Sequence, residues 1–353
     1  MRKLHPVKVG GLTLDGSKIY IQSMLNVPAE DIEGSVRQAV ELEKAGCEIV
    51  RASIPNMEAV KLIPAIKEAV SIPLVADIHF DYRIALECAA AEVDKIRINP
   101  GNIGGIDRVK AVADCCKARN IPIRIGVNSG SLEKELLAKY GRPCAEALVE
   151  SAMNHAALLE QCNFDDIVIS IKSSDVKTMI DAYRLAAEKT CYPLHLGVTE
   201  AGTERMGLIK SAVGIGSLLC DGIGETIRVS LTDDPVKEIA AAKDILMAVG
   251  KGHGVKFVSC PTCGRTKIDL VKLAKDVEMA VKDIPLDITV AVMGCAVNGP
   301  GEAREADIGI AGGDGCAVIF RKGQLLRKVR EDEVLGELLK EIDKLREEDK
   351  NCL

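Results

Sequence analysis

The fold is decided by residues 73–104, PLVADIHFDYRIALECAAAEVDKIRINPGNIG. A short apolar run at 73–78 ends in a polar loop, an alanine-rich helical stretch follows, and a second short apolar run occupies 95–98. Alternation of a short β-branched strand with a helix is typical of parallel β-α-β units, in which the helix carries the chain back to the next strand. The same pattern repeats on both sides of this segment, so it sets the expected architecture of residues 1–250.

Eight such strands can be counted, each followed by a stretch with the composition of a helix. They are IYIQSM (19–24), EIVRAS (48–53), PLVADI (73–78), KIRI (95–98), PIRIGV (122–127), DIVISI (166–171), PLHLGV (193–198) and TIRVSL (226–231). Eight strand–helix units in about 230 residues predict an α/β fold of the closed (β/α)8 TIM-barrel type over residues 1–250. The alternative, an open doubly wound sheet, would need a glycine-rich fingerprint after its first strand, and QSMLNVPAED at 22–31 contains no glycine.

The pattern changes after KGHG at 251–254. The expected elements beyond it are strands at 256–260 and 288–294, a helix over 267–283, three short strands divided by glycine turns, and a charged amphipathic helix at 332–349. We therefore expect a small α+β domain over residues 255–353.

Composition excludes several classes of protein. The chain has 353 residues, of which 47% are hydrophobic and 28% charged, so it can bury a core and is not disordered. A net charge of −6, 3% aromatic residues and no tryptophan argue against nucleic acid as a partner. There is no apolar run of about 18 residues and no secretory h-region, which predicts a cytoplasmic protein without a membrane partner.

Cysteine is abundant for a cytoplasmic chain, with 13 residues. In a reducing compartment a disulfide framework is not expected, and isolated cysteines serve as small core hydrophobes. We assign that role to the scattered ones, Cys47, Cys88, Cys144, Cys162, Cys191 and Cys220.

The carboxyl ends of the barrel strands, where TIM-barrel enzymes place their chemistry, are unusually polar. They carry Arg51, Asp77, His79, Arg97, Asn99, Arg124, Asn128, Lys172, His195, Glu200, Arg228 and Ser230. So many cations cannot stay unpaired inside one barrel without a large desolvation penalty. Arginine matches phosphate geometry, so the set predicts a phosphorylated substrate. Taken singly, each side chain is equally consistent with a structural role, and His195 with a hydrogen-bonded core histidine.

A second constellation lies near the C-terminus. C-P-T-C at 260–263 opens the second domain, and MGCAVNGPGEA at 293–303 supplies a further cysteine. A close pair and a third cysteine that a strand brings back can meet at one metal. A structural zinc site would need a fourth ligand such as Cys316 or His253. An iron–sulfur cluster held by three thiolates leaves one iron for another ligand, and Glu302 lies nearby in the sequence. The spacing predicts a metal site and leaves both options open.

These motifs resemble a known family. SCPTCGR at 259–265 and MGCAVNGPGEA at 293–303 are similar to the cysteine motifs of bacterial 4-hydroxy-3-methylbut-2-enyl diphosphate synthases, the iron–sulfur reductases of the methylerythritol phosphate route to isoprenoids. Barrel segments such as ADIHFDYR (76–83), KIRINPGNIG (95–104) and GIGETIRVSLTDDP (222–235) resemble the same family. The resemblance covers essentially the whole chain and is to the compact two-domain type.

The resemblance implies a [4Fe–4S] cluster, with Cys260, Cys263 and Cys295 as thiolate ligands and Glu302 as the carboxylate ligand. It implies reductive dehydration and ring opening of 2-C-methyl-D-erythritol 2,4-cyclodiphosphate to (E)-4-hydroxy-3-methylbut-2-enyl diphosphate. Two electrons would come from flavodoxin or ferredoxin. It also implies a homodimer in which the barrel of one subunit faces the cluster domain of the other.

The strand-end pattern and the resemblance together define the predicted site. The substrate-binding set is Arg51, Arg97, Asn99, Arg124, Asn128, Lys172, His195 and Ser230. The predicted catalytic residues are Glu200 for proton handling, Asn298 close to the cluster, and Glu302.

Two other functions remain as alternatives. A zinc-stabilised TIM-barrel enzyme acting on a phosphorylated small molecule, with aldolase-like or pterin-like chemistry, would hold a colourless structural metal. A non-enzymatic electron carrier built on the second domain would leave the basic barrel mouth without a purpose.

Overall fold

The computed structural model describes residues 2–295 and 304–352, with no side-chain description beyond Glu348. The chain divides between Lys251 and Gly252 into two compact units. Within the described ranges, no helix combines the length and the apolar character that a membrane crossing requires.

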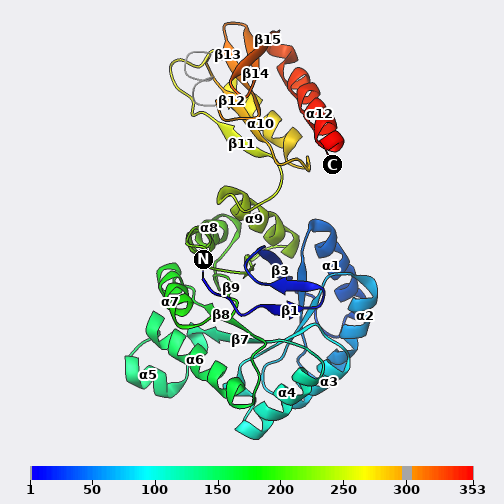
Figure 1. The fold of residues 1–353 in the computed structure, drawn as a ribbon, viewed down its shortest axis with the longest axis vertical. Coiled ribbons are helices and arrows are strands. Elements are labelled where there is room, and N and C mark those ends of the chain that lie inside the picture. The colour runs from blue at the N-terminus through cyan, green and yellow to red at the C-terminus, as the bar shows by residue number, and fades with distance from the viewer. Residues whose placement is uncertain (1, 296–303, 353) are drawn as a thin grey trace. The chain divides into compact units, whose positions relative to one another are not determined.

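The first unit is the predicted TIM barrel (Figure 1). Its eight strands pair in parallel in the order β8-β7-β6-β5-β4-β3-β10-β9, and a bridge from Ile169 to Leu194 joins the two end strands. The strands are β3 (Tyr20–Met24), β4 (Ile49–Ser53), β5 (Leu74–Asp77), β6 (Lys95–Ile98), β7 (Ile123–Asn128), β8 (Ile167–Lys172), β9 (His195–Leu196) and β10 (Thr226–Ile227).

Helices surround the strands on the outside of the barrel (Figure 1). They are α1 (Ile32–Ala45), α2 (Leu62–Ala69), α3 (Tyr82–Ala90), α4 (Ile106–Ala118), α5 (Lys134–Tyr140), α6 (Ala145–Gln161), α7 (Val176–Lys189), α8 (Glu204–Cys220) and α9 (Pro235–Ala248). Aspartates define several helix starts, because a carboxylate accepts the free backbone N–H groups of the first turn. Asp31 accepts from Gly34, Asp175 from Thr178 and Asp234 from Val236.

The last two strands are shorter than the sequence predicts. Pro193 has no N–H to donate to a ladder, and β9 begins only at His195. After β10, the backbone N–H of Leu231 donates to Glu238 Oε1 at 3.0 Å, so a side chain of α9 replaces a strand partner. The chain therefore leaves the sheet early and continues as irregular backbone at the carboxyl end of the barrel.

An N-terminal hairpin closes the amino end of the barrel, and the sequence analysis did not anticipate it. β1 (Val7–Val9) and β2 (Leu12–Leu14) pair antiparallel, with Gly10 in the turn at a φ of +55°. Its fully buried apolar side chains pack on residues at the strand starts: Val7, Val9 and Leu14 on Tyr20, Ile49, Val75 and Val168. Alternation on both sides of Gly-Gly in VKVGGLTL was the signal that could have predicted this hairpin.

The second unit is an α+β fold, as predicted. β11 (Lys256–Ser259), β12 (Thr289–Met293) and β13 (Ile308–Gly313) are parallel, and β14 (Cys316–Arg321) and β15 (Gln324–Arg330) continue the sheet antiparallel. Helices α10 (Leu270–Val281) and α12 (Val334–Cys352) bury their apolar sides in one core with the sheet.

The scattered cysteines follow the predicted core role only in part. Cys47, Cys88 and Cys162 are buried, but Cys191 and Cys220 are exposed. The prediction was wrong for these two because both lie at the ends of their helical segments, at the barrel surface.

Candidate active site and metal centre

A cavity of about 190 Å³ opens at the carboxyl ends of the barrel strands. It is lined by Arg51, His79, Arg97, Arg124, Gly126, Asn128, Ser170, Lys172, Thr199 and Arg228. Side chains alternate along a strand, so every second residue of each strand enters the barrel. The register pairs Arg97 of β6 with Arg124 of β7, which places two of these cations on neighbouring strands.

Asp77 is the carboxylate that organises this cavity. Arg51 Nη2 lies 2.5 Å from Asp77 Oδ2, and Arg97 Nη1 lies 3.1 Å from Oδ1. Burial alone would raise the pKa of Asp77, but the charges of Arg51 and Arg97 hold it well below its ordinary value. Asp77 is therefore ionised and fixes the orientation of two guanidinium groups.

The other cationic side chains of the cavity have few negatively charged partners. Arg124 is only 1% exposed; its Nη1 donates to Gln22 Oε1 at 3.4 Å, and its Nε has no partner within the described residues. Arg228 Nε lies 3.8 Å from Glu238. Burial, and then the charge of Arg228, hold the pKa of Lys172 well below its ordinary value. A multiply charged anion would supply the missing negative charge.

Five of the predicted substrate-binding residues line this cavity, namely Arg51, Arg97, Arg124, Asn128 and Lys172. Three others are not among its lining residues. Asn99 accepts a hydrogen bond from Gly101 N at 3.2 Å and so caps the turn that follows β6. His195 is fully buried, with Nδ1 2.8 Å from Thr226 Oγ1. Ser230 is half-buried beyond the end of β10.

Glu200 lies at the mouth of the barrel in an unusual backbone conformation. It follows Thr199, a lining residue, and is exposed with a φ of +52°. A non-glycine residue at positive φ costs free energy and occurs preferentially at functional sites. Asn298 and Glu302, the other two predicted catalytic residues, lie outside the residues that the structure describes.

Several lining residues were not in the predicted binding set, notably Arg228, His79 and Gly126. Arg228 follows isoleucine in TIRVS, as Arg97 and Arg124 do in their strands, and that repeated context was the available signal. A Cβ at position 126 would lie 2.5 Å from Arg97 Nε, so this glycine makes room for the guanidinium.

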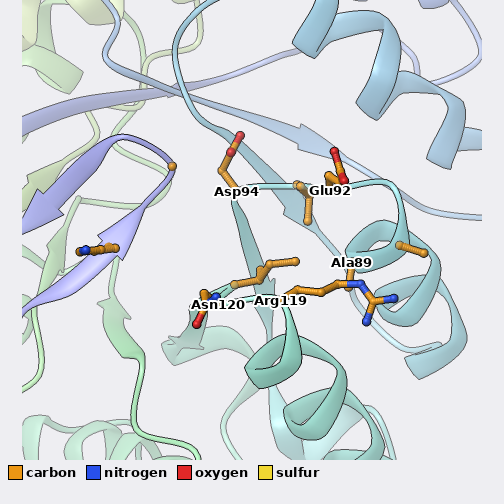
Figure 2. Close-up of a pocket in the computed structure, with 10 residues that line it drawn as sticks. Ala89, Glu92, Asp94, Arg119 and Asn120 are labelled. Carbon is orange, nitrogen blue, oxygen red and sulfur yellow. The ribbon is translucent and has the colours of Figure 1, made fainter.

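A larger hollow, of about 560 Å³, lies at the amino end of the barrel (Figure 2). Its labelled side chains come from the connections that enter β6 and β7, and they include Glu92 and Asp94. Asp94 already accepts hydrogen bonds from Leu74 N and Lys67 Nζ, at 2.8 and 3.0 Å. These carboxylates disfavour an anion, and TIM-barrel active sites occupy the opposite end, so the smaller cationic cavity is the candidate active site.

In the second unit, the three predicted thiolate ligands lie in the loops that follow the carboxyl ends of the parallel strands β11 and β12. Cys260 directly follows β11, Cys295 follows the parallel neighbour β12, and Cys263 lies in the loop before α10. Gly294 N donates to Cys260 Sγ at 3.1 Å, which ties the first and third cysteine segments together. Hydrogen bonds to the cysteine sulfurs are a feature of iron–sulfur sites, so the chemistry of this donor set is compatible with a thiolate-held metal group.

Within the described ranges, no three His, Cys, Asp or Glu side chains are grouped so that they could hold a metal ion. His253 cannot be the fourth ligand of a zinc site with these cysteines, because it lies at the other end of the strands. It precedes β11 and contacts Asp287, which precedes β12, at 2.9 Å. Cys316 begins β14, which runs antiparallel to β13. Cys316 therefore lies at the same end of the strands as Cys260.

The described residues thus form a two-domain protein, a TIM barrel with a cationic cavity followed by an α+β unit with cysteines at the carboxyl ends of its parallel strands. The chain belongs to the GcpE family. The GcpE TIM-barrel domain matches residues 4–243, and the GcpE C-terminal domain matches residues 256–344. This confirms the resemblance drawn from the motifs.

Two relatives of this chain carry the same name. The chain is 58% identical over 344 residues to the 4-hydroxy-3-methylbut-2-en-1-yl diphosphate synthase (flavodoxin) of Clostridium perfringens, covering 97% of this chain and 99% of the relative. It is 56% identical over 343 residues to the protein of that name from Fusobacterium nucleatum, covering 97% of each chain.

Among solved structures, dihydropteroate synthase from Stenotrophomonas maltophilia matches with a TM-score of 0.51 and 14% identity, covering 69% of this chain and 96% of that one. At this identity the likeness shows the barrel fold alone.

Proposed function

We propose that this chain converts 2-C-methyl-D-erythritol 2,4-cyclodiphosphate into (E)-4-hydroxy-3-methylbut-2-enyl diphosphate. The name of its relatives gives the product and flavodoxin, and the motif resemblance implies the substrate. The ring is opened, water leaves, and two electrons and protons are consumed. The observation that carries the proposal is the cavity, in which cationic side chains outnumber carboxylates. In the same chain, the second unit has three cysteines at or after the carboxyl ends of its parallel strands.

The cavity binds the diphosphate of the substrate. Arg97 and Arg124 face the cavity with positive charge that few protein carboxylates offset, and Lys172 lines the same cavity. Arg51 and Arg97 are held in place by Asp77, so the site is oriented before the substrate arrives. Because water is largely excluded from this interior, each charge–phosphate contact is strengthened.

The remaining barrel residues position and protonate the substrate. Asn128 lines the cavity and donates or accepts a hydrogen bond at the substrate hydroxyl groups, whereas Asn99 and Ser230 follow β6 and β10 without lining it. Glu200 is exposed at the mouth and holds the proton that leaves with water. His195 is fully buried and does not line the cavity, so its effect on the substrate is indirect, through the side chains that do line it.

Cys260, Cys263, Cys295 and Glu302 would hold a [4Fe–4S] cluster; Glu302 and the predicted catalytic residue Asn298 lie outside the described residues. When bound, the cluster supplies the reducing electrons, which flavodoxin or ferredoxin delivers. The chain works in the cytoplasm as a homodimer in which the barrel of one subunit meets the cluster domain of the other. If the chain forms this homodimer, the holoenzyme is expected to sediment at twice the chain mass, and sedimentation at the mass of one chain would contradict the assembly.

The test is anaerobic turnover. Holoenzyme, cyclic diphosphate and reduced flavodoxin are incubated together, and the linear diphosphate product is detected by mass spectrometry. Cys295→Ser is expected to abolish product, whereas Cys220→Ser, an exposed cysteine of the barrel, retains activity. Failure of the wild-type holoenzyme to form product, or full activity of Cys295→Ser, contradicts the proposal.

A further inference from the structure

Lys95, which none of the roles above uses, lies inside the barrel beneath the cationic cavity. It opens β6, two residues before Arg97, so both side chains enter the barrel from the same face of the strand. Lys95 is 0% exposed and is not among the residues that line the cavity. Its Nζ has no hydrogen-bond partner within the described part of the chain.

The groups that face Lys95 are themselves cationic or neutral. Arg51 of β4 and Arg124 of β7 act on it electrostatically, and Lys95 in turn acts on His195 of β9. The carboxylate of this interior, Asp77, is already engaged by Arg51 and Arg97. A charged ammonium at this position would be without water and repelled by guanidinium groups that cannot lose their charge.

The amine of Lys95 is therefore neutral while the cavity above it is empty. Burial is the largest cause that lowers its pKa well below the ordinary value, and Arg124 and Arg51 lower it further. A diphosphate among Arg97, Arg124 and Lys172 would reverse part of this effect, because its negative charge offsets the repulsion from the guanidinium groups.

On this basis, and resting on the proposed function, we propose that Lys95 takes up a proton when the cyclic diphosphate binds. The step is R–NH2 plus one solvent proton giving R–NH3⁺, with no other bond made or broken. Lys95 is thus a positioning residue that completes the charge balance of the occupied site through Arg124 and Arg51. Because the complex then holds more protons than the free protein, affinity for the diphosphate falls as pH rises through the range in which Lys95 titrates.

Proton uptake is measured by isothermal titration of the oxidised holoenzyme with the cyclic diphosphate, in buffers of different ionisation enthalpy. No reductant is present, so no turnover occurs. Both phosphates belong to the ring, and each keeps a single strongly acidic hydroxyl, so the ligand itself does not titrate near neutral pH. The dependence of the heat on the buffer gives the number of protons taken up.

The wild type is expected to take up about one proton per ligand through Lys95. Lys95→Met removes the titrating group, and Lys95→Arg replaces it with a group that stays charged, so both variants lose this uptake. Lys110→Met, on the exposed face of α4, is the matched control and keeps it. Thermal unfolding establishes that each variant is folded.

Wild-type heats that do not depend on the buffer across neutral and mildly alkaline pH overturn the inference. Uptake of wild-type size in both Lys95 variants assigns the proton to another group, such as Lys172 or His195, and overturns it as well. If the wild type binds the cyclic diphosphate without proton uptake, the proposed function stands and this inference fails. Absence of any binding heat contradicts the proposed function and the inference together.

Discussion

Arg124 contributes charge to the cavity and little pairing to the fold. It is almost completely buried, yet the hydrogen bond from its Nη1 to Gln22 Oε1 is long, at 3.4 Å, and its Nε has no partner within the described residues. Arg51 and Arg97 repel it, and both lower its pKa after burial does. The proposed function explains this unfavourable position, because it places an anion beside Arg124.

Replacement of Arg124 by alanine should therefore weaken binding far more than folding. Loss of a buried charge contact to a phosphate costs about 3 kcal/mol, or roughly a hundredfold in Kd for the cyclic diphosphate. The void left behind destabilises the fold, but relief of repulsion with Arg51 and Arg97 offsets part of that cost. Titration calorimetry and thermal unfolding measure the two effects.

Arg83→Ala is the matched control for that experiment, because Arg83 is exposed and pairs with Asp81 at the surface. It should leave both the Kd and the unfolding temperature nearly unchanged. An Arg124→Ala protein with wild-type affinity would remove Arg124 from the binding site.

At the residue scale, the sequence could predict cations at strand ends but not their partners. Arg97 and Arg124 were found because strand position alone sends them to the carboxyl end of the barrel. Lys95 was missed because it begins its strand, and only the structure shows that it is buried without a partner. Asn99 was predicted to bind substrate, but its side chain caps a turn, a local role that strand periodicity does not distinguish.

At the scale of elements, the N-terminal hairpin contributes buried apolar packing to the stability of the barrel. Val7, Val9 and Leu14 are fully buried against residues at the strand starts, so the hairpin forms the floor of the barrel interior. The apolar packing is thus at the amino end of the barrel, and the charged side chains are at the carboxyl end.

Truncation of Leu14 to alanine should lower the free energy of unfolding by about 3 kcal/mol, as for other buried leucines. The Kd for the cyclic diphosphate should not change, because the cavity lies at the opposite end of the strands. Lys8→Ala, on the exposed side of the same hairpin, is the control for denaturant unfolding. A large loss of affinity in Leu14→Ala would show that the floor and the cavity are coupled.

Element boundaries were predictable where hydrophobic periodicity alone decides them. β6 spans the predicted residues, Lys95–Ile98; β4 begins one residue later than predicted, and β5 is one residue shorter at each end. β9 and β10 are shorter because a proline and the side-chain contact from Glu238 to Leu231 N interrupt the ladder, and strand periodicity does not show the second of these. The hairpin was missed although its Gly-Gly turn was visible.

For the whole molecule, the sequence predicted domains over residues 1–250 and 255–353, and the structure forms two compact units that divide after Lys251. The first unit gathers cationic side chains at the carboxyl ends of its barrel strands. The second gathers thiols at the ends of parallel strands, where successive loops meet. The identity of the metal could not be predicted from spacing, because three cysteines fit both zinc and iron, and it came from the resemblance to the family.

The most direct measurement is the metal content of the protein purified without oxygen, together with its absorption spectrum. The account predicts about four iron and four sulfide per chain, with broad visible absorbance. One zinc per chain and no sulfide would contradict it. The cationic cavity would then belong to a zinc-stabilised barrel enzyme, and the reductive chemistry would have to be withdrawn.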